Sequence, residues 1–600
     1  MKKYLTIICC LWLFISCPSA YAISATSLFT DPSQITKTTL DNKIVGVDGP
    51  ALKNAATRLD ILKNAAGKDL TEDEIQTLYK EGPAAIKAAM MPYGYTNPQV
   101  TANLTRMGTH WTATYQVTPG PQIIVTAVDV KITGMGQNNP ALTQLLNNLP
   151  IKIGLPFNAD DYSNTKKQLL NTALELGYLD AKFMMHQVQI NRTTRQAQEQ
   201  LLLDTGPQYY FGGVHFSPSP LQDKFLQRYV PFKSGEKYTA AKLLQLQQNL
   251  TASGYFAEIQ VRPDRQHTMN QAVPINVILT MKKKIQYSIG AGYGTDTGPR
   301  GTLGLNLRWL NDTGQNFKAL ITGSEIQNSI SAKYIIPGKD PLKQQYYVSA
   351  SVGQETPPNN STGYLQKVST GYSTIVDGWT QDISLNAQHE NYSIEGAPFQ
   401  ESVLFYPQAT WSRNNYDNIL FPLHGGNVNF SVLGTATEIG STSTFAQGEL
   451  KGQYVYSLTA ANRFVARGDI GYTVIKNLNS LPLSLQFFAG GAQSIRAYQY
   501  QGLGPGRTLA VGSLEYQREI YNKWYAAIFY DAGNAANHVF HCTSEDIANG
   551  VNCGIKNSPG IGAMWASPVG PLELDVAQAI DESGKWYKNV QISFSMGANV

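Results

Sequence analysis

The sequence is poor in cysteine, in charged side chains and in long apolar runs. Only 15% of its 600 residues are charged and the formal net charge is +4. This balance disfavours a dedicated nucleic-acid binder, because such proteins carry a marked basic excess. After Ala22, no run reaches the roughly 18 apolar residues that a membrane-spanning helix requires.

The sequence also lacks the common catalytic motifs. It contains no Gly-x-Ser-x-Gly, no His-Glu-x-x-His and no Gly-x-x-x-x-Gly-Lys-Ser/Thr. The glycine-rich stretch at 290–294 lies inside an alternating strand, which explains it without a phosphate site. His538 and His541 stand beside Cys542, but their spacing does not match a standard zinc pattern. We therefore predict a protein that is not an enzyme, with no catalytic residue, no cofactor and no metal.

The N-terminus has the pattern of a signal peptide over residues 1–22. Two lysines precede an apolar core, and Ala20-Tyr21-Ala22 supplies a cleavage site of small residues. A lipoprotein alternative would use Cys17, although Phe14 stands where leucine is preferred. Export removes three of the five cysteines and leaves Cys542 and Cys553, which could form a local disulfide in an oxidising compartment. The exported chain is then either soluble in the periplasm or a β-barrel.

The chain changes character near residues 281–284, and the part before this point repeats itself. A Gly-Tyr pair ends an amphipathic helix every ~80 residues, which predicts three similar units at 37–121, 122–207 and 208–282. Each unit reads as strand, helix, helix, strand, strand. In the first unit, Thr71 and Glu74 offer a capping box for a long helix. We expect Gly82-Pro83 to interrupt that helix, which would make the first unit the least regular.

Residues 283–600 read as a transmembrane barrel. Apolar and polar side chains alternate over segments of ~10 residues, as in Val590 to Met596, which is typical of strands that face lipid on one side and a lumen on the other. The predicted strands lie near residues 285, 301, 315, 328, 344, 363, 379, 403, 426, 443, 462, 508, 523, 558, 571 and 588. Sixteen strands is an even number, as an antiparallel barrel requires. The predicted fold is three periplasmic α+β units followed by a 16-stranded antiparallel β-barrel.

One long glycine-rich segment, residues 490–507, interrupts the barrel pattern, and we call it the lid loop. It carries a single cation, Arg496, in the sequence Ile495-Arg496-Ala497-Tyr498. An arginine in the lumen of a barrel needs an acidic partner, and two candidates follow in the next strands. Alternation with its neighbours points Glu515 into the lumen, and Asp531 lies in Phe529-Tyr-Asp-Ala-Gly533.

These motifs together resemble the POTRA-plus-barrel outer-membrane assembly proteins, the superfamily that contains BamA, TamA and the two-partner secretion transporters. The lid loop is similar to the family's Val/Ile-Arg-Gly-Phe/Tyr signature, with Ala497 in place of glycine, and residues 529–533 match its Phe-x-Asp-x-Gly strand. Residues 413–425 and 560–571 are similar to two further strand signatures. In the family the acid of the Phe-x-Asp-x-Gly strand receives the lid arginine, which the resemblance assigns to Asp531. Three POTRA units point to the TamA branch.

The resemblance implies a function in translocation and assembly at the bacterial outer membrane. It implies unfolded β-barrel or autotransporter clients, contact with outer-membrane lipid, and a TamB-like inner-membrane-anchored partner that binds the POTRA units, with no role for nucleic acid. Gly290, Gly292 and Gly294 weaken the first strand, so a seam between the first and last strands is expected to open sideways. The alternative is a secretion pore that passes a soluble exoprotein through the lumen.

Overall fold

The computed structural model describes residues 38–67, 70–459, 461–544, 551–568, 570–580 and 590–596. The predicted signal peptide lies outside these residues. The chain divides into two compact units, one made of residues 1–173 and 180–206 and the other of residues 174–179 and 207–600. The first contains two α/β repeats, and the second contains the third repeat and the barrel.

Three three-stranded sheets confirm the predicted repeat. In each sheet the last strand lies in the centre, parallel to the first strand and antiparallel to the second. The first repeat consists of β1 (Thr39–Val45), α1 (Gly49–Ala66), α2 (Glu72–Met90), β2 (Gln99–Met107) and β3 (His110–Thr118). The second consists of β4 (Ile124–Thr133), α3 (Pro140–Asn147), α4 (Ala159–Glu175), β5 (Lys182–Asn191) and β6 (Gln196–Asp204). The third consists of β7 (Tyr210–Phe216), α5 (Asp223–Leu226), α6 (Ala240–Ala252), β8 (Phe256–Pro263) and β9 (Ala272–Met281). None of the helices in the described ranges has the length and apolar character needed to cross a membrane.

The long helix of the first repeat is continuous, so the expected break at Gly82-Pro83 is wrong. Helix α2 runs from Glu72 to Met90 with Pro83 inside it, and its predicted capping box at Thr71 and Glu74 is present. The glycine is needed for packing, because a Cβ at Gly82 would lie 2.2 Å from the hydroxyl oxygen of Tyr115. Tyr115 is fully buried. Tertiary packing of the sheet on the helix thus outweighs the local tendency of the proline to end it.

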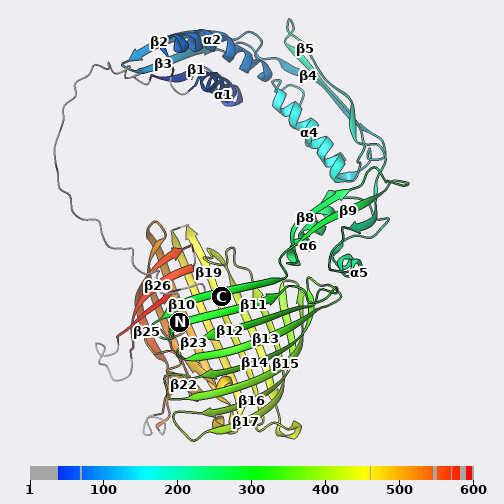
Figure 1. Cartoon of the computed structure of the whole chain (residues 1–600). Helices are drawn as coiled ribbons and strands as arrows, with labels where there is room; N and C mark the ends of the chain where they lie inside the picture. Colours follow the sequence, from blue (N-terminus) through cyan, green and yellow to red (C-terminus); the bar gives the residue numbers. More distant parts are fainter. Residues whose placement is uncertain are drawn as a thin grey trace, which may run out of the picture. The chain divides into compact units, whose positions relative to one another are not determined.

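Sixteen antiparallel strands close into a barrel, as the alternation predicts (Figure 1). They are β10 (Ile285–Gly294), β11 (Gly298–Leu307), β12 (Asn316–Gly323), β13 (Gln327–Pro337), β14 (Gln344–Glu355), β15 (Thr362–Val376), β16 (Trp379–Ser393), β17 (Gln400–Asn414), β18 (His424–Thr435), β19 (Phe445–Thr459), β20 (Asn462–Ile475), β23 (Thr508–Tyr521), β24 (Trp524–Ala536), β25 (Lys556–Ser567), β26 (Gly570–Gln578) and β27 (Val590–Met596). Ladder pairing around the ring satisfies the backbone hydrogen bonds that a bilayer cannot satisfy.

The third repeat packs directly on the first turns of the barrel. The buried side chain of Trp309, in the turn after β11, belongs to the same apolar cluster as Phe225 and Tyr255 of the repeat. The Tyr255 hydroxyl donates to the carbonyl of Gly314 at 2.6 Å. The backbone amide of Gln222 donates to the backbone carbonyl of Asp312 at 2.9 Å. This repeat is therefore joined to the part of the barrel that contains the first strands.

A glutamate is buried in the core of the second repeat. Glu199 of β6 points to the helix-covered face between Ala197 and Leu201 and is 1% exposed. Among the described residues no donor reaches its Oε2 atom. Burial, and to a smaller extent the nearby Asp161 carboxylate, raise the pKa of Glu199 from 4.5 to about 7. The charged form is therefore unfavourable in the folded repeat.

We predict that Glu199 makes the second repeat less stable as pH rises. Its pKa is higher in the folded than in the unfolded state, so the folded state binds more protons between pH 4.5 and about 7. Stability falls through this window by about 3 kcal/mol and stays low above it. Glu199→Gln should remove this loss, so that hydrogen exchange of the β6 amides in the full-length protein shows equal opening free energies at pH 5 and pH 8.

The matched control is Glu175→Gln, which removes an exposed carboxylate from the end of α4. This variant should keep the pH dependence of the parent protein. If the parent repeat opens with the same free energy at both pH values, Glu199 is solvated in solution and the prediction fails.

Candidate functional site

The connection between β20 and β23 lies against the inner wall of the barrel along its whole length. Its first part, residues 476–489, is called the lumen segment here, and the lid loop follows at 490–507. The lumen segment places Leu478 and Leu481 in one apolar cluster with Tyr406 of the barrel wall. Its Ser484 amide donates to Oε1 of Glu390 on β16 at 3.1 Å. The short strands β21 (Phe487–Ala489) and β22 (Leu503–Gly506) then pair to form the base of the lid loop.

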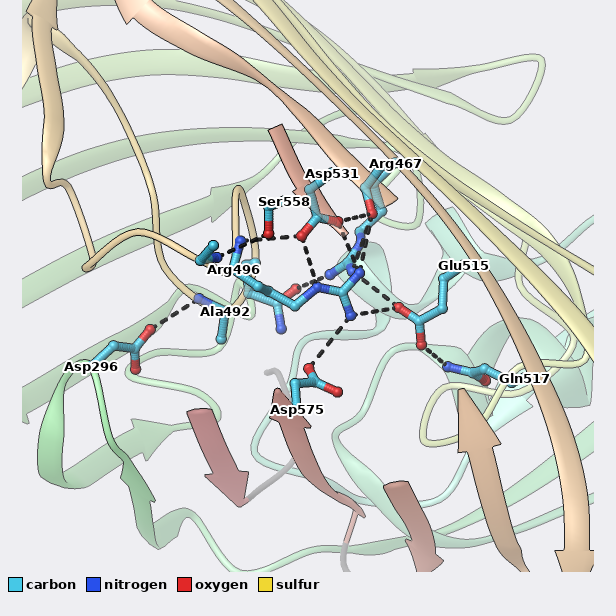
Figure 2. Close-up of polar contacts among 12 residues, drawn as sticks. Asp296, Arg467, Ala492, Arg496, Glu515, Gln517, Asp531, Ser558 and Asp575 are labelled. Atoms are coloured by element: carbon cyan, nitrogen blue, oxygen red, sulfur yellow. Dashed lines mark hydrogen bonds and ion pairs between the residues drawn. The ribbon is translucent and has the colours of Figure 1, made fainter. Parts of the chain in front are cut away.

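Arg496 forms a two-pronged ion pair with Asp531 at the tip of the lid loop. Its Nε donates to Oδ2 of Asp531 at 3.0 Å and its Nη2 donates to Oδ1 at 2.9 Å, as Figure 2 shows. The backbone amide of Arg496 donates to the same Oδ2 at 3.1 Å. Such a fork fixes direction as well as distance, which a lysine could not do. Both side chains are buried, at 2% and 0% exposure.

Further groups surround the guanidinium on its other sides. Its Nη1 donates to Oε2 of Glu515 on β23 at 2.8 Å and lies 3.4 Å from Oδ2 of Asp575 on β26. Its carbon lies 3.2 Å from the ring centre of Phe529, in a cation–π contact. A second arginine, Arg467 of β20, also reaches Glu515 at 3.3 Å. The structure thus brings the predicted cation and both predicted acids into one cluster.

This cluster gathers two arginines and three carboxylates whose side chains are largely buried. Asp531 also accepts a hydrogen bond from Ser513, at 2.7 Å, so both of its oxygens are satisfied. A buried ion pair of this kind contributes little net stability when it is complete. When one partner is removed, however, the loss is about 3–5 kcal/mol because a charge is left unpaired. The lid loop is therefore fixed in one position as long as Arg496 is present.

The residues beside Arg496 fix the loop by packing. Ile495 is fully buried in an apolar cluster with Phe487 and Leu509, and Tyr498 packs at the edge of the same cluster. Ala497 is buried against Phe529, and its amide donates to the Ser558 hydroxyl at 3.0 Å. Ala497 is not among the described residues with positive φ. The backbone at this position therefore accepts alanine in place of the glycine of the family signature.

The first and last strands meet over a very short seam. Only Tyr293↔Met596 and Gly294↔Ser595 pair there among the described residues, whereas β10 and β11 pair from Ile285 to Gly294. Gly292 contributes to the seam by its lack of a side chain. A Cβ at Gly292 would lie 2.7 Å from Nε of Arg300, whose guanidinium crosses β10 and donates to the Met596 carbonyl at 3.1 Å.

The other glycines of the first strand also lie against neighbouring polar groups. A Cβ at Gly290 would lie 2.4 Å from Oγ1 of Thr302, and one at Gly294 would lie 2.7 Å from Oγ1 of Thr297. From residue 290 to residue 294, the three glycines therefore leave the lumen side of β10 without side chains, and side chains of β11 and its turn occupy that space.

The loop after β24 contains a disulfide between Cys542 and Cys553. The rings of His538 and His541 stack beside it, with centroids 5.4 Å apart. In the parts of the chain that the structure describes, no group of three or more His, Cys, Asp or Glu side chains is placed to hold a metal ion.

Several members of the site were missed by the sequence reasoning. Asp575 carried the same signal as Glu515, since it alternates with Leu574 and Val576, and could have been found. Glu390 could not, because its partner Ser484 lies 94 residues away in a segment without periodicity. The same holds for Asp296, in the turn between β10 and β11, whose Oδ2 accepts a hydrogen bond from the amide of Ala492 at 3.1 Å.

Three family models match the chain. Residues 310–599 match the Omp85 superfamily domain, and residues 41–119 match the POTRA domain described as TamA domain 1. Residues 209–282 match a POTRA model described as a surface antigen variable number repeat. These matches cover the barrel from residue 310 onward and most of the first and third repeats.

Relatives and solved structures of the same architecture are similar to the chain. It is 21% identical over 382 residues to the outer membrane protein assembly factor BamA of Neisseria meningitidis serogroup B, covering 58% of this chain and 45% of that protein. It is 22% identical over 414 residues to BamA of Neorickettsia risticii, covering 62% and 53%. The chain thus spans about half the length of these curated relatives.

The barrel fold has a counterpart among solved structures. The crystal structure of BamA from Haemophilus ducreyi lacking POTRA domains 1–3 superposes with a TM-score of 0.67 at 17% identity, covering 79% of this chain and 99% of that chain. At this identity the likeness concerns the fold alone. Taken with the family models, the fold identifies the chain as a member of the Omp85 superfamily, with its barrel in the bacterial outer membrane and its POTRA units in the periplasm.

Proposed function

We propose that this protein is a TamA-like translocation and assembly factor that inserts β-barrel or autotransporter clients into the outer membrane through a laterally opening seam. The observation that carries the proposal is the seam itself. Two ladder pairs join β10 to β27 in the described residues, against seven between β26 and β27 on one side and ten between β10 and β11 on the other. Within the described ranges, the barrel has its fewest ladder pairs where its two ends meet.

An open seam would offer what a client strand needs. Among the described residues, none of β27 pairs with the edge of β10 between Ile285 and Gly292, and its backbone donors and acceptors could pair with an incoming strand. On its outer face Tyr287 and Ile289 are 74% and 83% exposed, ready to continue the apolar surface of the barrel. Each strand added to this edge would exchange backbone hydrogen bonds with β10 rather than leave them unpaired in lipid.

A chamber inside the barrel supplies a route to this edge. A cavity of about 1280 Å³ lies within the barrel, bounded by the lid loop at Ala492 and Tyr500 and by the seam at Gly290 and Ser595. Its lining includes both seam strands, so a client segment in the lumen would already lie beside the edge it has to join.

Two features of the repeats favour the proposed partner and the proposed clients. The first repeat matches a POTRA model named for TamA, which favours a TamB-like inner-membrane-anchored partner bound through this domain. Each three-stranded sheet has two edge strands, β4 and β5 in the second repeat for example, and such edges can accept an extended segment. Outer-membrane lipid would be the third party, because the insertion takes place at the seam.

A secretion pore of the two-partner type is the rival function. It would need a lumen that a chain can cross, and the lid loop is instead fixed inside the lumen, on the barrel wall, by buried ion pairs and apolar contacts. This geometry favours insertion at the seam over passage through the lumen.

We predict that Arg496→Ala opens the lumen. Removal of the guanidinium leaves the buried Asp531 carboxylate without a cation and leaves Glu515 with Arg467 alone, at a cost of about 3–5 kcal/mol that the lid loop can escape by leaving the wall. In planar bilayers the parent protein should show a small, noisy single-channel conductance, and the variant a larger one. Arg496→Lys should be intermediate, because lysine keeps the charge without the fork.

Arg518→Ala is the control, since Arg518 is an exposed arginine of the same strand that carries Glu515. It should leave the conductance unchanged. A large and steady conductance in the parent protein that is indifferent to Arg496→Ala would mean an open lumen, and the pore function would then be preferred.

We predict that locking the seam stops insertion. Tyr293→Cys combined with Met596→Cys places two thiols at paired positions across the seam, and their oxidation should abolish insertion of a client barrel into vesicles. Reduction should restore it, because only strand separation has been blocked.

The matched control is Ile330→Cys with Val352→Cys, a pair of exposed, directly opposite residues on β13 and β14. Its oxidation should leave insertion intact. The same reduction step is applied to the parent protein, which carries the Cys542–Cys553 disulfide. Full insertion activity with the seam cross-linked would contradict the proposed mechanism.

A further inference from the structure

The lid loop contacts the barrel on both sides of the seam. On the side of the closing strands, Arg496 binds Asp531 of β24 and reaches Asp575 of β26. On the side of the opening strands, the amide of Ala492 donates to Oδ2 of Asp296 at 3.1 Å. Figure 2 shows both contacts in one view, with Asp296 and Asp575 approached from the same loop. The segment 492–496 therefore bridges the two ends of the barrel sheet.

The turn that holds the lid loop also holds the last strand. In the turn between β10 and β11, the amide of Thr295 donates to the carbonyl of Phe594 at 3.1 Å. The amide of Phe594 in turn donates to the hydroxyl oxygen of Thr295 at 3.1 Å. Adjacent residues thus bind different partners, since Thr295 binds β27 and Asp296 binds the lid loop.

The bridging segment is folded tightly and has little slack. The amide of Gly491 donates to the carbonyl of Tyr498 at 2.8 Å, and the amide of Ser494 donates to the carbonyl of Gly491 at 3.0 Å. These bonds close a compact turn around Arg496. If β10 moved away from β27 while Arg496 stayed on β24, the turn could not lengthen without losing them. The bond between Ala492 and Asp296 would have to break first.

We propose that the lid loop holds the seam closed, as a strap between the two ends of the barrel sheet, and that Asp296 is the residue whose release lets the seam open. The strap adds a charge-assisted hydrogen bond to a junction for which the described part of the chain provides two ladder pairs. Release of Asp296 lets the first hairpin swing away with the lid loop still anchored at Arg496. This inference rests on the proposed function, because it assigns a control of opening to the seam through which clients would pass.

The test is hydrogen exchange of the seam in the full-length protein, held in lipid nanodiscs. A hydrogen bond to a charged acceptor is strong enough that its loss should raise the open population, and with it the exchange rate of the β27 and Thr295 amides, by about tenfold. Asp296→Ala should show this increase. Asp296→Asn keeps an acceptor oxygen at the same place and should exchange close to the parent rate. Glu438→Ala, at an exposed acid in the loop after β18, should have no effect.

A double variant separates a strap from a local effect on the turn. In Arg496→Ala the lid loop has lost the ion pairs that bind it to the closing strands, so adding Asp296→Ala should bring no further increase. A second tenfold increase in this background would show that Asp296 only stabilises its own turn, and would overturn the proposal. Equal exchange in Asp296→Ala and the parent protein would overturn it as well.

The two hypotheses fail in different ways. If Asp296→Ala leaves exchange unchanged while the oxidised Tyr293→Cys, Met596→Cys pair abolishes insertion, the strap is wrong and the proposed function stands. If exchange rises as expected but the cross-linked seam still inserts clients, the strap is real and the seam is not the route of insertion.

Discussion

The ion pair between Arg496 and Asp531 is the interaction on which the interior of this barrel depends. A sixteen-stranded barrel encloses a wide lumen, and a loop of thirty-two residues would not stay inside it by backbone contacts alone, since its own sheet is only the short β21–β22 hairpin. The forked bond, both of whose partners are almost fully buried, gives the loop one position. Glu515 and Asp575 add two further carboxylates around the guanidinium and Arg467 adds a second cation, so that three strands of the wall, β23, β24 and β26, are bound through the single guanidinium of Arg496.

The seam is the opposite case, a place where the usual requirement for pairing is relaxed. Every other neighbouring pair of barrel strands forms a ladder of seven or more residue pairs in the described residues, while β10 and β27 form two. Side chains make up part of the difference: Arg300 crosses over Gly292 to reach the Met596 carbonyl, and Thr295 pairs with Phe594. Side-chain bonds of this kind can be exchanged one at a time, whereas a long ladder opens only cooperatively.

The sequence predicted what depends on local pattern. All sixteen barrel strands begin within a few residues of their predicted places, because alternation with period two is visible strand by strand. The lid arginine and its two candidate acids could be named from motif and alternation. The continuity of α2 could not be predicted, because it depends on Tyr115 of strand β3, which packs against Gly82. Nor could the contact between Asp296 and Ala492, in which a turn carboxylate meets a backbone amide 196 residues away and no side-chain pattern marks the partner.

The two parts of the β20–β23 connection are held by different combinations of contacts. The lumen segment rests on an apolar cluster with Leu478, Leu481 and Tyr406, and water cannot replace contacts of this kind. The lid loop combines its own apolar cluster around Ile495 with the buried ion pairs of Arg496 and the hydrogen bond from Ala492 to Asp296. Water or a client backbone can replace the polar contacts but not the apolar ones. A change confined to the part of the lid loop that contacts Asp296 therefore costs the least, because it leaves both apolar clusters buried.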